Sequence, residues 1–112
     1  MSYLEKYAIG HGDRKSRRNY EIDDSLYVKL EALCEKYNIT ISELINVSIK
    51  YLIETEDIKL YKKDDFEITV VHTISVKESN IKGLDYLKGK YGVSIYKLVN
   101  IAIKNALKES ND

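Results

Sequence analysis

The chain has 112 residues, enough for one small domain or a pair of very small units. Its 18 Lys and Arg residues balance 18 Asp and Glu residues, which argues against a protein that coats nucleic acid by bulk charge alone. The single cysteine, Cys34, excludes an internal disulfide framework, and no apolar run approaches the roughly 20 residues of a membrane-spanning helix. We therefore expect a cytoplasmic protein that has no membrane partner.

We expect residues 1–16 to form a flexible arm that ends in a basic cluster. All three arginines of the chain lie between positions 14 and 18, before and within the first predicted strand. Arg14 and Lys15 are therefore candidates for contacts with an anionic partner bound beside that strand. A solvated run of charges is the alternative interpretation of the same residues.

Residues 17–54 show the pattern of a strand followed by two helices. Apolar and polar residues alternate over residues 17–23 and place Tyr20 and Ile22 on one side, which is typical of a strand with one buried face. Leucines at helical spacing come next, and the final segment of this unit carries a wide apolar stripe. The pattern therefore predicts one amphipathic strand and two amphipathic helices.

Polar residues mark the ends of these predicted helices. Asp23 or Asp24 is suited to cap the first helix. Asn38 tolerates the left-handed backbone that ends a helix, and Thr40 stands where the cap of the second helix belongs. These residues predict a tight turn between the two helices.

Residues 68–109 repeat the pattern at a fixed offset of 54 positions. Ten of the 30 residues from 25 to 54 are identical to their partners in 79–108, where about two identities would arise by chance. Amphipathic periodicity does not explain the identities Lys36/Lys90, Asn46/Asn100 and Lys50/Lys104. We interpret the repeat as a duplicated unit, with a connector at 55–67 and a short tail at 110–112.

A single unit would leave its strand with two unpaired edges, whereas two units can pair their strands. The predicted fold class is therefore mainly α with a two-stranded antiparallel ribbon. Two strand-helix-helix units are fused in one chain and form a pseudo-dimer around a common core.

This arrangement resembles the ribbon-helix-helix family of DNA-binding regulators (the Arc/MetJ/CopG type). The alternating strand, the two helices, and the turns Asn38–Thr40 and Gly92–Ser94 carry the resemblance. It covers residues 17–54 and 70–109. A fused pair is similar to the less common tandem members of the family, which include a conjugation protein and small regulators of archaeal viruses.

The resemblance implies that the ribbon enters the major groove of double-stranded DNA, a groove that admits a two-stranded ribbon. The alternation turns one set of side chains away from the core and toward base edges: Arg17, Asn19, Glu21, Val71, Thr73 and Ser75. Family likeness assigns phosphate contacts to the start of each second helix, and the arm adds two cations: Arg14, Lys15, Thr40, Ile41, Ser42, Ser94, Ile95 and Tyr96.

The two outward sets differ, so the ribbon is expected to read an asymmetric core site. Glu21 departs from the family pattern because it directs an acid toward an anionic groove. It could accept a hydrogen bond from a cytosine amino group or limit non-specific binding.

We therefore expect a sequence-specific transcriptional regulator, a repressor, that needs no cofactor. The alternatives are an accessory protein for plasmid transfer and an antitoxin-like module that binds another protein. The sequence leaves open whether pseudo-dimers associate further on DNA.

No catalytic or metal-binding role is expected for the polar residues that most often carry one. His11 and His72 lack the spacing of a metal site or a catalytic triad, and His72 is expected on the inner side of its strand. Cys34 is expected to be a buried structural thiol. Tyr37 and Tyr91 are expected to cover the core.

Overall fold

The computed structural model describes residues 13–110. Six elements follow one another in the chain: β1 (Lys15–Asp23), α2 (Asp24–Tyr37), α3 (Ile41–Thr55), β2 (Thr69–Lys77), α4 (Glu78–Tyr91) and α5 (Ile95–Ser110). The predicted class, mainly α with a two-stranded antiparallel ribbon, is confirmed. Each element of the second set begins 54 residues after its counterpart in the first.

The two strands form an antiparallel ribbon in which Asn19 lies opposite Thr73 at the centre. Period-two alternation gives the ribbon an inner face and an outer face. Tyr20 and Ile22 of β1 are buried on the inner face together with Ile74 and Val76 of β2. The predicted inner and outer faces of both strands are therefore confirmed, since a shift of one residue in either strand would expose its buried side chains.

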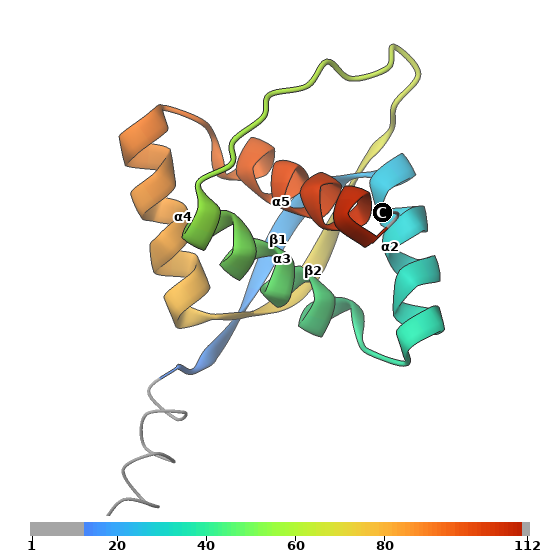
Figure 1. Cartoon of the computed structure of the whole chain (residues 1–112), viewed down its shortest axis with the longest axis horizontal. Helices are drawn as coiled ribbons and strands as arrows, with labels where there is room; N and C mark the ends of the chain where they lie inside the picture. Colours follow the sequence, from blue (N-terminus) through green and yellow to red (C-terminus); the bar gives the residue numbers. More distant parts are fainter. Residues whose placement is uncertain (1–12, 111–112) are drawn as a thin grey trace, which may run out of the picture.

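Helices α3 and α5 contact each other and cover the inner face of the ribbon, while α2 and α4 stand on opposite sides (Figure 1). Apolar side chains from all four helices meet in one core, in which Leu30, Ile49, Leu84 and Ile103 are almost completely buried. Fully burying such a side chain stabilises a protein by roughly 1.5–3 kcal/mol. The shared core therefore holds the two sets of elements together.

The predicted turns between the helices are confirmed. Asn38 and Gly92 both adopt left-handed backbone, with φ of 56° and 65°. The Thr40 hydroxyl accepts a hydrogen bond from the Glu43 N–H at 3.1 Å, as expected of a cap, and the Ser94 hydroxyl accepts one from the Lys97 N–H at 3.3 Å.

The side-chain cap predicted for the first helix is not formed, although Asp23 does stand at the N-cap position of α2. Asp23 precedes α2 without a side-chain cap, and the carboxylate of Glu67 instead accepts hydrogen bonds from the N–H and hydroxyl of Ser25. The carboxylate of Asp13 does the same for Ser79 of α4, at 3.0 Å to each donor. Antiparallel pairing brings the residue two positions before each strand to the start of the other half's helix.

The beginning of β1 also differs from the expectation. Lys15 belongs to the strand, opposite Lys77, and the Arg14 carbonyl accepts a hydrogen bond from the Glu78 N–H at 2.7 Å. The structure therefore includes four residues that were assigned to the arm, and two of them, Lys15 and Ser16, belong to β1 and pair with β2. The rest of that arm, residues 1–12, lies outside the described residues, as does His11.

The expectations for four single residues have mixed outcomes. Cys34 is buried, as predicted, and His72 lies on the inner side of β2, where its ring stacks on Tyr27 with centroids 3.7 Å apart. Tyr37 and Tyr91 do not cover the core, because they are 55% and 43% exposed at the last turns of α2 and α4.

Candidate nucleic-acid interface

The outer face of the ribbon carries the six side chains predicted to contact bases. They lie opposite one another in three cross-strand pairs: Arg17/Ser75, Asn19/Thr73 and Glu21/Val71. All of these residues are exposed except Ser75, which is partly buried. Directly opposed residues of a strand pair share one face of the sheet. The six side chains therefore lie together on the outer face of the ribbon, three on each strand.

The central pair of this face is joined by a hydrogen bond. The Thr73 hydroxyl donates to Asn19 Oδ1 at 2.7 Å, which holds the amide in one orientation. The second lone pair of Oδ1 and the Nδ2 donor remain suited to the N6 and N7 groups of an adenine.

The charge of the ribbon differs between its two ends. At one end Lys15 lies opposite Lys77, and both side chains are exposed on the outer face beside Arg17. At the other end the buried Asp23 lies opposite Thr69. Lys77 was missed by the sequence analysis, although it continues the alternation of Val71, Thr73 and Ser75.

Two helix N-termini lie along the outer edges of the ribbon. The Ser42 hydroxyl at the start of α3 accepts a hydrogen bond from the Ser75 N–H at 3.3 Å, which anchors that N-terminus to β2. Near the start of α5, the Asn100 side chain donates to the Glu21 carbonyl of β1 at 2.9 Å. The first N–H groups of a helix lack intrahelical partners and favour an anion, which suits the predicted phosphate contacts.

The phosphate-contacting residues predicted for these two N-termini are therefore found beside the ribbon. The first group is Thr40, Ile41 and Ser42, and the second group is Ser94, Ile95 and Tyr96. The Tyr96 hydroxyl is already engaged, because it donates to Asp23 at 2.8 Å. Only the backbone N–H of Tyr96 thus suits the predicted contact.

Asn46 and Asn100 bind the outer edge of each strand to a helix of the other half. Asn46 on α3 donates to the Ser75 carbonyl and accepts from the Lys77 N–H. Asn100 on α5 donates to the Glu21 carbonyl and accepts from the N–H of Asp23. The pair was noticed in the sequence as an identity at the 54-residue offset, but its role depends on contacts between residues far apart in the chain.

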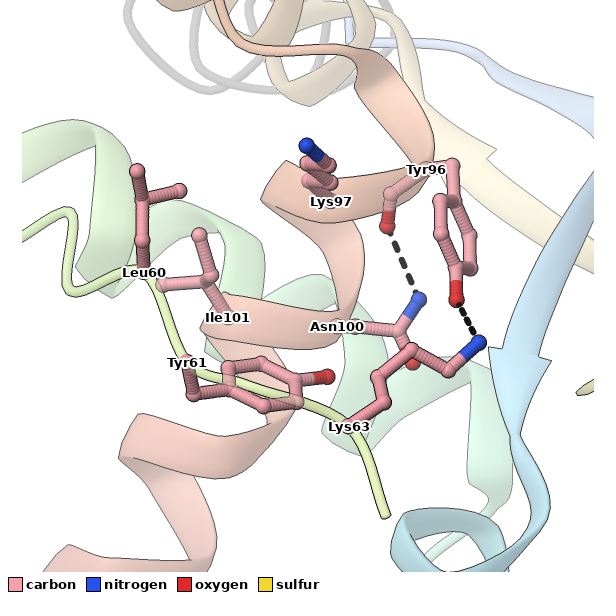
Figure 2. Close-up of a pocket in the computed structure, with 7 residues that line it drawn as sticks. All are labelled: Leu60, Tyr61, Lys63, Tyr96, Lys97, Asn100 and Ile101. Carbon is pink, nitrogen blue, oxygen red and sulfur yellow. Dashed lines mark hydrogen bonds between the residues drawn. The ribbon is translucent and has the colours of Figure 1, made fainter. Parts of the chain in front are cut away.

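The buried carboxylate of Asp23 organises the end of β1 that lies near α5. It accepts hydrogen bonds from the hydroxyls of Tyr61 and Tyr96, both at 2.8 Å, and from Thr69 at 3.2 Å. Lys63 Nζ lies 3.2 Å from the same carboxylate, and Figure 2 shows Lys63 reaching the Tyr96 hydroxyl. Burial raises the pKa of Asp23, but the hydrogen bonds from Tyr61, Tyr96 and Lys63 outweigh it and leave the pKa below its usual value.

The connector supplies two of these partners, a role that the sequence analysis did not assign to it. Figure 2 shows Tyr61 and Lys63 directed toward the α5 residues Tyr96, Asn100 and Ile101. The Tyr96 hydroxyl accepts a hydrogen bond from Lys63, and this bond together with the contact to Asp23 raises the pKa of the Lys63 ammonium. The connector therefore stabilises the N-terminus of α5 next to the ribbon.

No helix within residues 13–110 is long and apolar enough to cross a membrane. In the same part of the chain, no three His, Cys, Asp or Glu side chains come close enough together to hold a metal ion. Comparisons with protein-family models, curated proteins and solved structures found no match to this chain.

Proposed function

We propose that the protein is a tandem ribbon-helix-helix regulator that binds double-stranded DNA through its ribbon. The observation that carries the proposal is the outer face, where six side chains predicted to contact bases lie in three cross-strand pairs. A two-stranded ribbon fits the major groove, and helix N-termini on both sides of it are suited to the flanking phosphates.

The outer face offers chemistry for several base edges. Arg17 suits the O6 and N7 acceptors of guanine, and Asn19 suits adenine. Val71 suits the methyl group of thymine, while Glu21 can accept from the amino group of cytosine. Because the two strands present different side chains, a single molecule is proposed to read an asymmetric core sequence.

The proposed pseudo-dimer arises from duplication of one strand-helix-helix unit. Two sets of contacts recur at the 54-residue offset and support this origin. The edge contacts of Asn46 correspond to those of Asn100, and the cap from Asp13 corresponds to the cap from Glu67. The second unit thus takes the place that a second subunit takes in a homodimer.

The balanced net charge fits a regulator that relies on placed contacts more than on bulk attraction. Exposed cations gather at the Lys15/Lys77 end of the ribbon, next to Arg17. We propose repression of a promoter as the biological role, with the gene's own upstream region as the first candidate site.

Titration of the labelled upstream region of its own gene tests the proposal, with binding measured by fluorescence anisotropy at several salt concentrations. Arg17→Ala is expected to weaken specific binding about ten- to a hundredfold, because one good base contact contributes about 1–3 kcal/mol of discrimination. Arg18→Ala is the matched control. It removes the same charge from the same strand, but Arg18 lies opposite the buried Ile74 and outside the row of Arg17.

Arg18→Ala is expected to weaken binding by less than about fivefold, since only long-range charge is lost. Absence of binding by the unmodified protein at every salt concentration would contradict DNA binding. Equal losses of affinity for the two variants would contradict base reading by the outer face, but would leave DNA binding itself standing.

A further inference from the structure

Two grooves lie at corresponding positions of the two halves. The first, of about 660 Å³, is lined mainly by α3 and the start of α4, and the second, of about 390 Å³, by α5, the connector and the start of α2. Three pairs of lining residues are 54 positions apart: Ser25/Ser79, Lys50/Lys104 and Glu54/Lys108. The two grooves are therefore copies of one feature, and they can be compared position by position.

The second groove is strongly cationic, whereas the first is balanced. Three lysines and three carboxylates line the first groove, but five lysines and only two carboxylates line the second. Three different elements contribute the five lysines, which are Lys29 of α2, Lys62 and Lys63 of the connector, and Lys104 and Lys108 of α5. At the positions of Lys29 and Lys108 the other half has Gly83 and Glu54. The excess of positive charge is thus specific to one half of the molecule.

Two of the five ammonium groups already have partners. Lys63 Nζ lies 3.2 Å from the buried carboxylate of Asp23. The ammonium of Lys104 lies 4.1 Å from the centre of the Tyr61 ring, a cation–π contact that leaves its charge without a counter-ion. These two lysines therefore stabilise the connector in its place beside α5.

The other three ammonium groups are exposed and have no ion-pair partner within residues 13–110; they belong to Lys29, Lys62 and Lys108. The Glu67 carboxylate lines the same groove, but it accepts hydrogen bonds from the N–H and hydroxyl of Ser25. Like charges that line one groove repel each other, and a bound anion relieves that repulsion. The second groove is therefore suited to a ligand that carries several negative charges.

We propose that the second groove binds a chain of phosphate groups, such as that of inorganic triphosphate or of a nucleoside triphosphate. Each phosphate offers charged oxygens that accept hydrogen bonds from ammonium groups, so a short chain can contact lysines from three elements at once. The volume of about 390 Å³ lies within the roughly 300–1,000 Å³ that is typical of small-ligand sites.

This site is separate from the proposed DNA-reading surface. None of the residues that line the second groove belongs to β1 or β2, whereas Lys15 and Lys77 of the ribbon line the first groove. A duplex that contacts the outer face of the ribbon therefore does not need the lysines of the second groove. The proposal goes beyond DNA binding and does not rest on it.

Calorimetric titration of the full chain with inorganic triphosphate tests the proposal, without DNA or divalent cations and at about 50 mM salt, where screening is weak. One site per chain is expected. Lys62→Glu and Lys108→Glu are each expected to weaken binding at least about tenfold, because each reverses a charge close to a multiply charged anion. Lys82→Glu is the matched control and is expected to weaken binding less than about threefold, since this exposed lysine of α4 lines neither groove.

Three results would overturn the proposal. The first is absence of binding at millimolar triphosphate, and the second is an equal loss for Lys82→Glu, which would indicate attraction by bulk charge. The third is a comparable loss of DNA affinity for Lys62→Glu and Lys108→Glu but not for Lys82→Glu, because the groove would then contact the DNA backbone. A parallel titration with adenosine triphosphate distinguishes the two sources: equal affinity indicates the phosphate chain alone, and tighter binding indicates a nucleotide.

Discussion

The two halves of the protein share the contacts that join them and differ in the side chains that they present to solvent. Asn46 and Asn100 are identical and make the same backbone contacts on opposite edges of the ribbon. On the outer face, in contrast, Arg17 corresponds to Val71, and Glu21 corresponds to Ser75.

This difference separates the requirements of folding from those of recognition. An exposed strand edge must satisfy its N–H and C=O groups, and the paired asparagines do so in both halves. The outer face has no such backbone requirement, because its side chains project from the ribbon into solvent. Sequence can therefore diverge there without loss of the fold, which is compatible with the proposed reading of an asymmetric site.

The largest expected effect comes from breaking the contact that the halves share. Asn100→Ala removes the side-chain partners of the Asp23 N–H and the Glu21 carbonyl. Buried backbone groups left without partners cost about 1–3 kcal/mol each, so the free energy of unfolding is expected to fall by about 2–4 kcal/mol. Urea unfolding measures the loss, and Asn46→Ala is expected to show a similar one.

Asn105→Ala is the control for this comparison, because Asn105 lies on the same helix and its side chain donates to the Asp57 carbonyl of the connector rather than to the ribbon. It is expected to cost less than about 1.5 kcal/mol. A loss for Asn105→Ala as large as that for Asn100→Ala would show that the ribbon edge has no special importance.

A smaller effect is expected where the halves differ at corresponding positions, Asp23 and Lys77. Asp23→Asn weakens hydrogen bonds from two tyrosines and the ion pair with Lys63. Hydrogen bonds to a charged group contribute about 1.5–3 kcal/mol, which sets the expected loss at neutral pH. Lys77→Gln is the matched control and is expected to be nearly neutral, because the Lys77 side chain is exposed.

The pH dependence sharpens this prediction. The pKa of Asp23 is lower in the folded protein than in the unfolded chain, so its contribution is complete above about pH 4 and disappears as pH falls through the folded pKa. The stability difference between the unmodified protein and Asp23→Asn is therefore expected to shrink below about pH 4. A difference that stays constant from neutral pH to pH 3 would argue against an ionised Asp23.

The smallest effects are expected at the two caps contributed across the halves. Asp13→Ala and Glu67→Ala each remove the carboxylate that binds the first turn of a helix, at a cost of about 1 kcal/mol. Hydrogen bonds from Ser79 lower the pKa of Asp13, and those from Ser25 lower the pKa of Glu67. Thermal unfolding is expected to show similar losses for both variants, and a loss at only one cap would break the correspondence.

The sequence alone determined the features that depend on local periodicity. Alternation placed Tyr20 and Ile22 inside the ribbon and Arg17 and Asn19 outside, because side chains of a strand point to opposite faces in turn. Asn38 and Thr40 likewise marked a turn through the backbone conformation and the hydrogen bond that each residue type favours. The 54-residue repeat indicated two such units, and pairing their strands explained how one chain closes its core.

Only the tertiary structure decided which distant residues meet. Asp23 looked like a helix cap, but folding buries its carboxylate among Tyr61, Lys63 and Tyr96, while Glu67 takes over the cap. These partners are 38 to 73 residues away from Asp23 in the chain, so no local pattern reports them. Antiparallel pairing of β1 with β2 brings them together, because it sets the start of each strand against the end of the other.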